Sequence, residues 1–488
     1  MSFIVHRKLL VAALAGFGIV SLLSLPARVI AQQRNKPNIL FLEVDDLNYK
    51  YVHQLGCSFI KTPNIDALAR AGVYFRNAMC QGMMCGPSRN SLITGLYPHN
   101  LGFYRNGQMG ELPHGVWSFP AALQRAGYYT AWIGKSHIHP PGARSNPAAM
   151  ETELGFNHVQ KTLGRAMLGS GKSRPGDWYF EHLQKAGLLE KFRREFPHPS
   201  TLPEDDYLDG FFTRAVLDFL DRYDHRQPLF LWVNYSLPHG PYDVSREYHD
   251  LYSTDIMPGV TKAHYQVPPN LVKDTKPVRT VERAKQNQAG FCAAITFLDR
   301  QIGRILKKLD QQGMRDNTMI VFFSDHGIMM GDHERFHKGT LFRQVTNPTL
   351  IISQPLRFRT GTTVDAPVEL RDILDTCLDL ADAPPADRGK YPGYSLLPLL
   401  TGKGTFQRKY AFGEIEGYAA VTDGRYRLIK GKDVTLLFDE QKDRDDLWNI
   451  ASQYPQVVAR LSAALDTWRE KTGPALPPQR KKRKAKKH

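Results

Sequence analysis

Cysteine is scarce in this sequence, with five residues in a chain of 488. The five thiols are an odd number and are spread widely, so a disulfide framework is excluded and at least one thiol is unpaired or modified. Cys57 and Cys80 are one possible pair, although the sequence does not show whether they are close in space. The cysteines are Cys57, Cys80, Cys85, Cys292 and Cys377.

The sequence lacks internal repeats, and its N-terminal apolar run, Leu9 to Leu25, is short for a membrane span. Basic residues at positions 6–8 precede this run, and the small residues of positions 29–31 follow it. This order is typical of a cleaved export signal. We therefore expect a signal peptide at residues 1–31, no membrane span, and a mature protein that is exported to the periplasm or the extracellular space.

Acidic residues are fewer than basic ones: the chain has 48 Asp and Glu and 64 Lys and Arg, so its formal net charge is +16. Three of these charges lie in residues 1–31 and seven in the tail at 480–488, which leaves +6 for the rest. The basic tail is either a solvated, disordered segment or a segment that binds a polyanion such as sulfated polysaccharide. A nuclear signal does not fit behind an export signal, so no nucleic-acid partner is expected.

Four short apolar runs each stop at polar side chains, and helical patterns separate them. Such runs are typical of strands buried on both faces, and their alternation with helices predicts an α/β sandwich with a largely parallel or mixed sheet. Ligands bind beyond the carboxyl ends of such strands, so the four polar clusters are expected to converge. The runs are 38–46, ending at Asp45 and Asp46; 128–137, ending at Lys135 and His137; 228–239, ending at His239; and 318–327, ending at Asp325 and His326.

The residue types in these clusters predict the chemistry of the site. Asp45, Asp46 and Asp325 offer hard oxygen ligands, which favour Ca²⁺ or Mg²⁺ over zinc, and His326 adds a nitrogen. The surrounding cations and histidines suit a tetrahedral oxyanion, such as the sulfate or phosphate group of an ester. These residues are Arg89, Lys135, His137, His239 and Lys338.

The stretch CGPSRNSLITG, residues 85–95, predicts a helix with Cys85 at or just before its N-terminus and Gly95 at its end. A helix N-terminus stabilises an anionic reaction centre, so Cys85 is a candidate reactive group. Taken alone, the stretch also fits a buried structural cysteine.

The same stretch resembles the signature of type I sulfatases, in the alkaline phosphatase superfamily: cysteine or serine, any residue, Pro-Ser-Arg, three variable positions, a hydrophobic residue, Thr-Gly. Other segments resemble further blocks of that family in the same order, among them PNILFLEVDDL, GYYTAWIGKSH, SLPHGPY and FFSDHG. The resemblance extends from Pro37 to the segment near residue 450. Within the family, the sequence is similar to iduronate-2-sulfatase and choline sulfatase.

The resemblance implies an alkaline phosphatase-like sandwich with a large mixed sheet and a smaller C-terminal antiparallel sheet. The implied units are a catalytic domain at 32–402, a C-terminal subdomain at 403–473 and a disordered basic tail at 474–488. Two polar stretches, 140–205 and 241–280, are expected to be irregular and to shape the substrate subsite.

The resemblance also implies a cofactor and a modification. Cys85 would be oxidised to formylglycine by a maturation enzyme that recognises Cys85, Pro87 and Arg89, and the hydrated aldehyde would attack sulfur. One Ca²⁺ would be bound by Asp45, Asp46, Asp325, His326 and the modified Cys85. Arg89 and His137 would hold the diol, while Lys135, His239 and Lys338 would grip the sulfate and assist protonation of the leaving group.

Some points stay open at this stage. Many members of the family carry asparagine where this chain has His326, and the sequence does not decide which histidine is the acid. The favoured function is an exported sulfatase acting on a sulfated carbohydrate. The alternatives are a phosphonate monoester or phosphodiester hydrolase, and a non-catalytic protein that binds sulfated glycans. The oligomeric state is not predicted.

Overall fold

The computed structural model describes residues 36–474, apart from 144–145, 147, 163, 165–167, 170 and 172–175. The predicted signal peptide and, beyond residue 474, the predicted tail lie outside the described residues. No helix within the described ranges is both long and apolar enough to cross a membrane.

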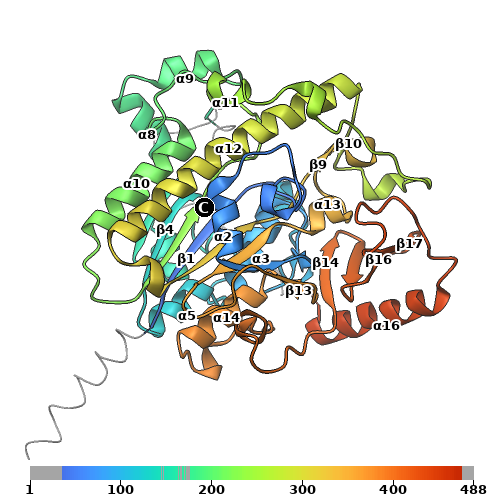
Figure 1. The fold of residues 1–488 in the computed structure, drawn as a ribbon. Helices are drawn as coiled ribbons and strands as arrows, with labels where there is room; N and C mark the ends of the chain where they lie inside the picture. The colour runs from blue at the N-terminus through green and yellow to red at the C-terminus, as the bar shows by residue number, and fades with distance from the viewer. Residues whose placement is uncertain are drawn as a thin grey trace, which may run out of the picture.

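A twisted eight-stranded sheet forms the centre of the molecule (Figure 1). β1 lies between β8 and β6 and pairs with both in parallel, and β4 and β5 continue the parallel part. β11 runs antiparallel to both of its neighbours, so the sheet is mixed and the predicted fold class is confirmed. In order, the strands are β12 (Thr362–Val364), β2 (Gly72–Phe75), β11 (Leu350–Ser353), β8 (Thr318–Ser324), β1 (Asn38–Val44), β6 (Leu229–Asn234), β4 (Tyr129–Lys135) and β5 (His158–Thr162).

Helices cover both faces of this sheet. Each face has its own core, because successive side chains of a buried strand point to opposite faces. Leu40 and Leu42 of β1 belong to one core, and Ile39 and Phe41 belong to the other. The first core is covered by α2 (Pro63–Arg70), α10 (Leu208–Arg222) and α12 (Val281–Gln311), and the second by α3 (Cys85–Thr94), α5 (Phe119–Arg125) and α14 (Asp372–Leu380).

The two cores separate the cysteines that the sequence left as a possible pair. Cys57 packs in the first core and Cys80 in the second, on opposite faces of the sheet. All five thiols are free and buried. The possible Cys57–Cys80 bridge is therefore wrong, and Cys57 and Cys80 each serve as a small apolar group in their own core.

The stretch 140–205 is more regular than expected. Its described residues include β5 and three helices, so the expectation of irregular chain there is wrong, whereas 241–280 has only short elements. The remaining short elements are α4 (Pro98–Leu101), α6 (Ala149–Leu154), α8 (Trp178–Lys185), α9 (Leu189–Glu195), α11 (Arg246–His249), α13 (Arg343–Thr346), α15 (Leu397–Thr401), β3 (Ala78–Met79), β7 (Lys276–Pro277), β9 (Met329–Met330), β10 (Arg335–His337) and β13 (Val368–Glu369).

A separate antiparallel sheet follows near the C-terminus, as the resemblance implies. One face, with Ala420 and Ile429, joins the second core of the large sheet. The other face packs against Leu461 and Leu465 of the last helix. The elements are β14 (Ala411–Ile415), β15 (Tyr418–Thr422), β16 (Tyr426–Gly431), β17 (Thr435–Asp439) and α16 (Pro455–Thr472). The domain boundary at residues 402–403 stays a prediction.

Buried charges join the small sheet to the large one. Glu440 accepts hydrogen bonds from Arg343 Nη1 at 2.7 Å and from Arg427 Nη2 at 2.8 Å, and all three side chains are at most 2% exposed. Arg343 begins α13, and Val345 in the same helix accepts a hydrogen bond from Gly327 N at 2.8 Å. The cluster thus connects the small sheet with the loop that follows β8.

Candidate active site

Cys85 is the first residue of α3, and its side chain is buried. The helix ends at Gly95, which takes the left-handed conformation with φ of 65° that glycine adopts without strain. The predicted helix is therefore confirmed at both ends. Its N-terminus presents Cys85 where the helix dipole favours negative charge.

The carboxylates reach Cys85 because β1 and β8 are paired in parallel. Val44 lies opposite Ser324, so the residues that follow, Asp45 and Asp325, leave the same edge of the sheet side by side. Asp46 N donates to Asp325 Oδ1 at 3.4 Å, which ties the two loops together. The expectation of convergence at the carboxyl ends of the strands is confirmed for these two clusters.

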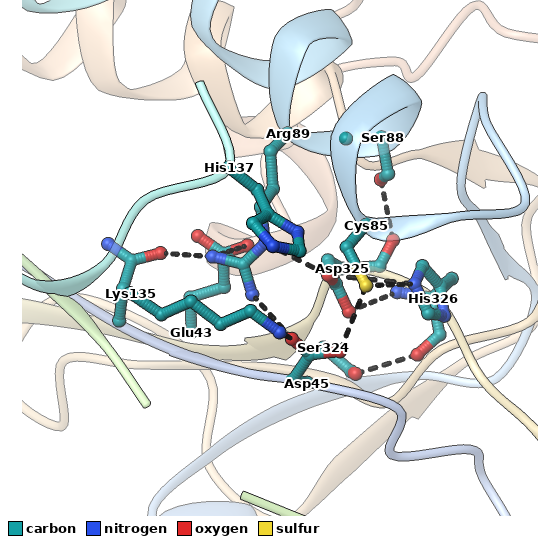
Figure 2. Close-up of polar contacts among 12 residues, drawn as sticks. Glu43, Asp45, Cys85, Ser88, Arg89, Lys135, His137, Ser324, Asp325 and His326 are labelled. Atoms are coloured by element: carbon teal, nitrogen blue, oxygen red, sulfur yellow. Dashed lines mark hydrogen bonds and ion pairs between the residues drawn. The ribbon is translucent and has the colours of Figure 1, made fainter. Parts of the chain in front are cut away.

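Four ligand atoms gather around one point, as Figure 2 shows for their side chains. Cys85 Sγ lies 3.3 Å from Asp45 Oδ1 and 3.4 Å from His326 Nε2. One atom from each of Asp45, Cys85, Asp325 and His326 lies within 4.8 Å of the others, and all four residues are buried. Asp46 adds a carboxylate 3.3 Å from His326 Nδ1. A mostly carboxylate donor set at this spacing fits one hard cation.

Two lysines reach this cluster. Lys338, directly after β10, donates to Cys85 Sγ at 3.0 Å and to Asp46 Oδ1 at 2.6 Å. Lys135, the last residue of β4, donates to Asp45 Oδ2. Lys338 therefore lies beside the cysteine sulfur, and both ammonium groups lie beside the carboxylates, as the sequence led us to expect.

Arg89 is completely buried one turn along α3 from Cys85. It bonds Asp325 Oδ2 at 3.0 Å through Nε and Asn234 Oδ1 at 2.7 Å through Nη1, and Glu43 Oε1 lies 3.1 Å from Nη1. The sequence analysis missed Glu43 and Asn234. A lone polar residue inside an otherwise apolar strand was the available signal for each.

The two remaining histidines occupy different positions. His239 follows β6, one third of its side chain is exposed, and its Nε2 lies 3.9 Å from Asp46 Oδ2. His137 follows β4 in a left-handed conformation with φ of 53°, and its buried Nδ1 has no hydrogen-bond partner among the described residues. Every residue predicted from the sequence for the site thus comes from the end of a strand, from the start of α3 or from the segment after β10.

The family model for sulfatases matches residues 37–383. The chain belongs to the sulfatase family. An arylsulfatase from Clostridium perfringens is 29% identical, over 88% of this chain and 94% of the relative. A choline-sulfatase from Rhizobium meliloti is 28% identical, over 88% and 86%. An N-acetylglucosamine-6-O-sulfatase from Bacteroides thetaiotaomicron is 26% identical, over 76% and 72%.

A solved phosphonate monoester hydrolase from Agrobacterium radiobacter has the same fold. Its TM-score is 0.76 at 23% identity, and the alignment covers 90% of this chain and 96% of the other. As a member of the sulfatase family, the protein is a sulfuric ester hydrolase.

The electrostatics of this sulfatase favour negative charge at residue 85. Burial and Asp45 oppose ionisation, but Lys338 and Lys135 overcome them and place the pKa of the Cys85 thiol below its ordinary value. Burial likewise opposes ionisation of Asp45, yet Lys135 and Lys338 hold the pKa of Asp45 well below its usual range. The site therefore stabilises an anion next to the helix N-terminus.

The histidines of the sulfatase divide into two classes. Burial, with Lys338 and Lys135 nearby, keeps the pKa of His239 well below its ordinary value, and burial with Lys135 does the same for the pKa of His137. For His326, burial alone lowers the pKa, but Asp325 reverses this and raises it to about 9. His137 and His239 are thus neutral imidazoles near pH 7.

A cavity of about 550 Å³ opens beside Asp46 and His239. Its wall carries Lys276, Arg279 and Arg283, which come from β7, the segment after it and the start of α12. The sequence analysis did not single out these cations, because nothing local to 276–283 marks them as neighbours of the strand ends. They make the entrance to the sulfatase site attractive to a polyanionic substrate.

Proposed function

We propose that this sulfatase removes sulfate from a sulfated carbohydrate outside the cytoplasm, with formylglycine at residue 85 and one Ca²⁺. The observation that carries the proposal is the position of Cys85, buried at the start of α3 with Asp45, His326 and Lys338 around its sulfur. A structural cysteine needs none of these charged neighbours. Export rests on the signal-like residues 1–31.

The nucleophile and the cation have separate roles. After conversion of Cys85, the hydrated aldehyde at residue 85 would supply the oxygen that attacks sulfur, and re-forming the aldehyde would expel sulfate once the sugar hydroxyl has left. A bound Ca²⁺ would be held by Asp45, Asp46, Asp325 and His326 and would polarise the sulfate oxygens. Arg89 keeps Asp325 in place through its 3.0 Å contact.

The remaining residues act on charge and protons. Lys338 lies beside the side chain of residue 85 and Lys135 beside Asp45, and both would stabilise the negative charge that develops on the sulfate oxygens. We assign proton donation to the leaving alcohol to His239, which would first take up a proton when the negative charge of the bound sulfate ester offsets the nearby Lys338 and Lys135. His239 lines the cavity through which the sugar enters, whereas His137 is not among the residues of that wall.

The carbohydrate assignment has two supports. An N-acetylglucosamine-6-O-sulfatase is among the relatives, and the cavity wall carries Lys276, Arg279 and Arg283. Choline sulfate, the substrate named for another relative, is a small zwitterion with one negative group, so it would not pair with three further cations at the entrance. The enzyme would therefore act on a substrate with additional negative groups.

The mass of the tryptic peptide Asn77–Arg89 tests the nucleophile. This peptide contains Cys80 and Cys85, so Cys80 is an internal control for alkylation. In protein purified from a host with the maturation enzyme, we expect one alkylated thiol and one aldehyde. Two alkylated thiols in fully active protein would exclude formylglycine chemistry.

Rates on matched aryl esters test the reaction class. We expect 4-nitrophenyl sulfate to be cleaved faster than the corresponding phosphonate monoester or phosphodiester, and Cys85→Ala to abolish turnover of all of them. Cys57→Ser, which changes a thiol outside the site, should keep full activity. Faster cleavage of the phosphorus esters would favour the alternative hydrolase, and no turnover of any ester would favour a glycan-binding protein.

A further inference from the structure

A second cavity lies on the C-terminal side of the molecule, where Figure 1 shows α16 and β14. Its volume is about 690 Å³, a size typical of ligand sites. Tyr97 on its wall follows the C-terminal end of α3, whereas Cys85 begins that helix, and ten helical residues span about 15 Å. The two cavities share no wall residue.

The wall of this cavity is strongly cationic. It has no acidic side chain among its described residues. Asp372 behind the wall neutralises Arg408, and Asp423 neutralises Arg460. The three lysines have no acidic partner within ion-pair distance in the described part of the chain. The six cations are Arg371, Lys390, Arg408, Lys409, Arg460 and Lys471.

Arg371 adds a buried cation to this wall. Its side chain is 2% exposed, and Nε and Nη1 have no hydrogen-bond partner among the described residues. Nη2 donates to the Tyr391 carbonyl, and Glu369 Oε2 is 3.7 Å from Nε, too far for a hydrogen bond. The guanidinium also lies 4.1 Å from the ring centre of Tyr97 and adds positive charge just behind the surface of the cavity.

Aromatic rings alternate with the cations. The Arg408 guanidinium lies 4.6 Å from the ring centre of Tyr394, and Lys390 Nζ lies 5.1 Å from that of Tyr391. These cation–π contacts orient the two rings at the wall. Flat rings pack against the C–H faces of pyranose sugars, and the neighbouring cations pair with sulfate or carboxylate groups.

We propose that this cavity is a second binding site, which holds one segment of an anionic polysaccharide while another segment reaches Cys85. The identity of the polymer as the substrate rests on the proposed function. Two sites on one chain convert the second contact into an intramolecular one and so raise the affinity for long substrates. Monosaccharide substrates gain nothing from it.

A binding comparison tests this proposal. The probe is a size-defined heparin oligosaccharide, and the protein is the mature chain with Cys85→Ala, which prevents hydrolysis. The cavity variant carries Lys409→Glu together with Lys471→Glu, which reverses the charge of two exposed residues of the cavity wall. The matched control makes the same charge change at the exposed Lys185 and Lys307 of α8 and α12.

We expect the cavity variant to bind the oligosaccharide at least about tenfold more weakly and the control less than about twofold more weakly. In protein that retains Cys85, the cavity variant should keep the wild-type kcat/KM for 4-nitrophenyl sulfate. Its KM for a long sulfated polysaccharide should rise.

Equal affinities of the cavity variant and the control would overturn the proposal. It would also be overturned if single-stranded DNA of similar charge bound as tightly as the oligosaccharide and lost as much affinity in the cavity variant. The binding comparison does not depend on turnover. A wild-type protein that hydrolyses no sulfate ester would reject the proposed function while a selective loss in the cavity variant still supported the site.

Discussion

Glu440 is the residue whose replacement should most clearly separate a buried charge cluster from a surface ion pair. It contacts Arg343 at 2.7 Å and Arg427 at 2.8 Å, and these side chains are at most 2% exposed. Burial opposes ionisation of Glu440, but the two arginines overcome it and lower the pKa of Glu440 from 4.5 to about 2. Glu440→Gln would leave two buried cations without their shared partner.

The magnitude follows from that pKa. The difference between the ordinary and the folded value corresponds to about 3 kcal/mol of stability. Breaking a buried ion pair on one side costs roughly 3–5 kcal/mol, which agrees. The contribution is fully present above about pH 4.5 and is lost as the pH falls through about 2.

A neighbouring carboxyl adds a second pH dependence. Burial raises the pKa of Asp446 to about 7, and the charge of Glu440 contributes to that increase. In Glu440→Gln the pKa of Asp446 should fall, so that near pH 8 its ionised carboxylate replaces part of the missing charge. The destabilisation is therefore expected to be largest near pH 5 and smaller near pH 8.

Urea unfolding at pH 5 and pH 8 measures how much Glu440→Gln lowers the free energy of unfolding at each pH. The control is Glu190→Gln, which removes the exposed 2.8 Å pair with Arg193, where the Glu190 side chain is 80% exposed. That change should cost less than about 1 kcal/mol. If Glu440→Gln costs no more than Glu190→Gln, or if its effect disappears in high salt, the reasoning from burial is refuted.

Further predictions concern the site. Asp325→Ala should lose the bound divalent cation, measured by elemental analysis, and also activity; full retention of both would reject the metal assignment. Lys338→Met should lower kcat/KM for sulfate esters by about 10²–10³-fold, while exposed Lys307→Met should not. His239→Ala should impair sugar sulfates more than 4-nitrophenyl sulfate, because a poor leaving group needs the proton; equal losses would argue against an acid role. Unfolded mature protein should titrate four thiols of the five encoded, and five would contradict conversion of Cys85.

Much of the fold could be predicted because the decisive signals are local. The four apolar runs became β1, β4, β6 and β8, and the stretch after Cys85 became a helix that ends at Gly95. β5 was missed because its strand, His158–Thr162, is mostly half-buried and polar, without an apolar run. The antiparallel direction of β11 depends on pairing with β8 and β2, which no local pattern encodes.

The residues of the candidate site likewise fall into those that the sequence indicates and those that only the structure shows. Asp45, Asp325 and Cys85 could be named because each follows or begins a regular element whose pattern is visible in the sequence. Glu43 and Asn234 stand out only as polar residues in apolar strands; their contact with Arg89 joins residues far apart in the chain, and no local pattern encodes it.

The sequence by itself determined which candidate site residues stand at the ends of strands and at the start of a helix, because strand periodicity and helix end signals act over a few neighbouring residues. Only the tertiary structure decided which of them meet. It placed Cys57 and Cys80 on opposite faces of the sheet, brought Lys276 and Arg279 to the entrance of the site, and gathered cations from distant segments around a second cavity. Each outcome depends on how distant segments pack, and packing is a property of the whole chain.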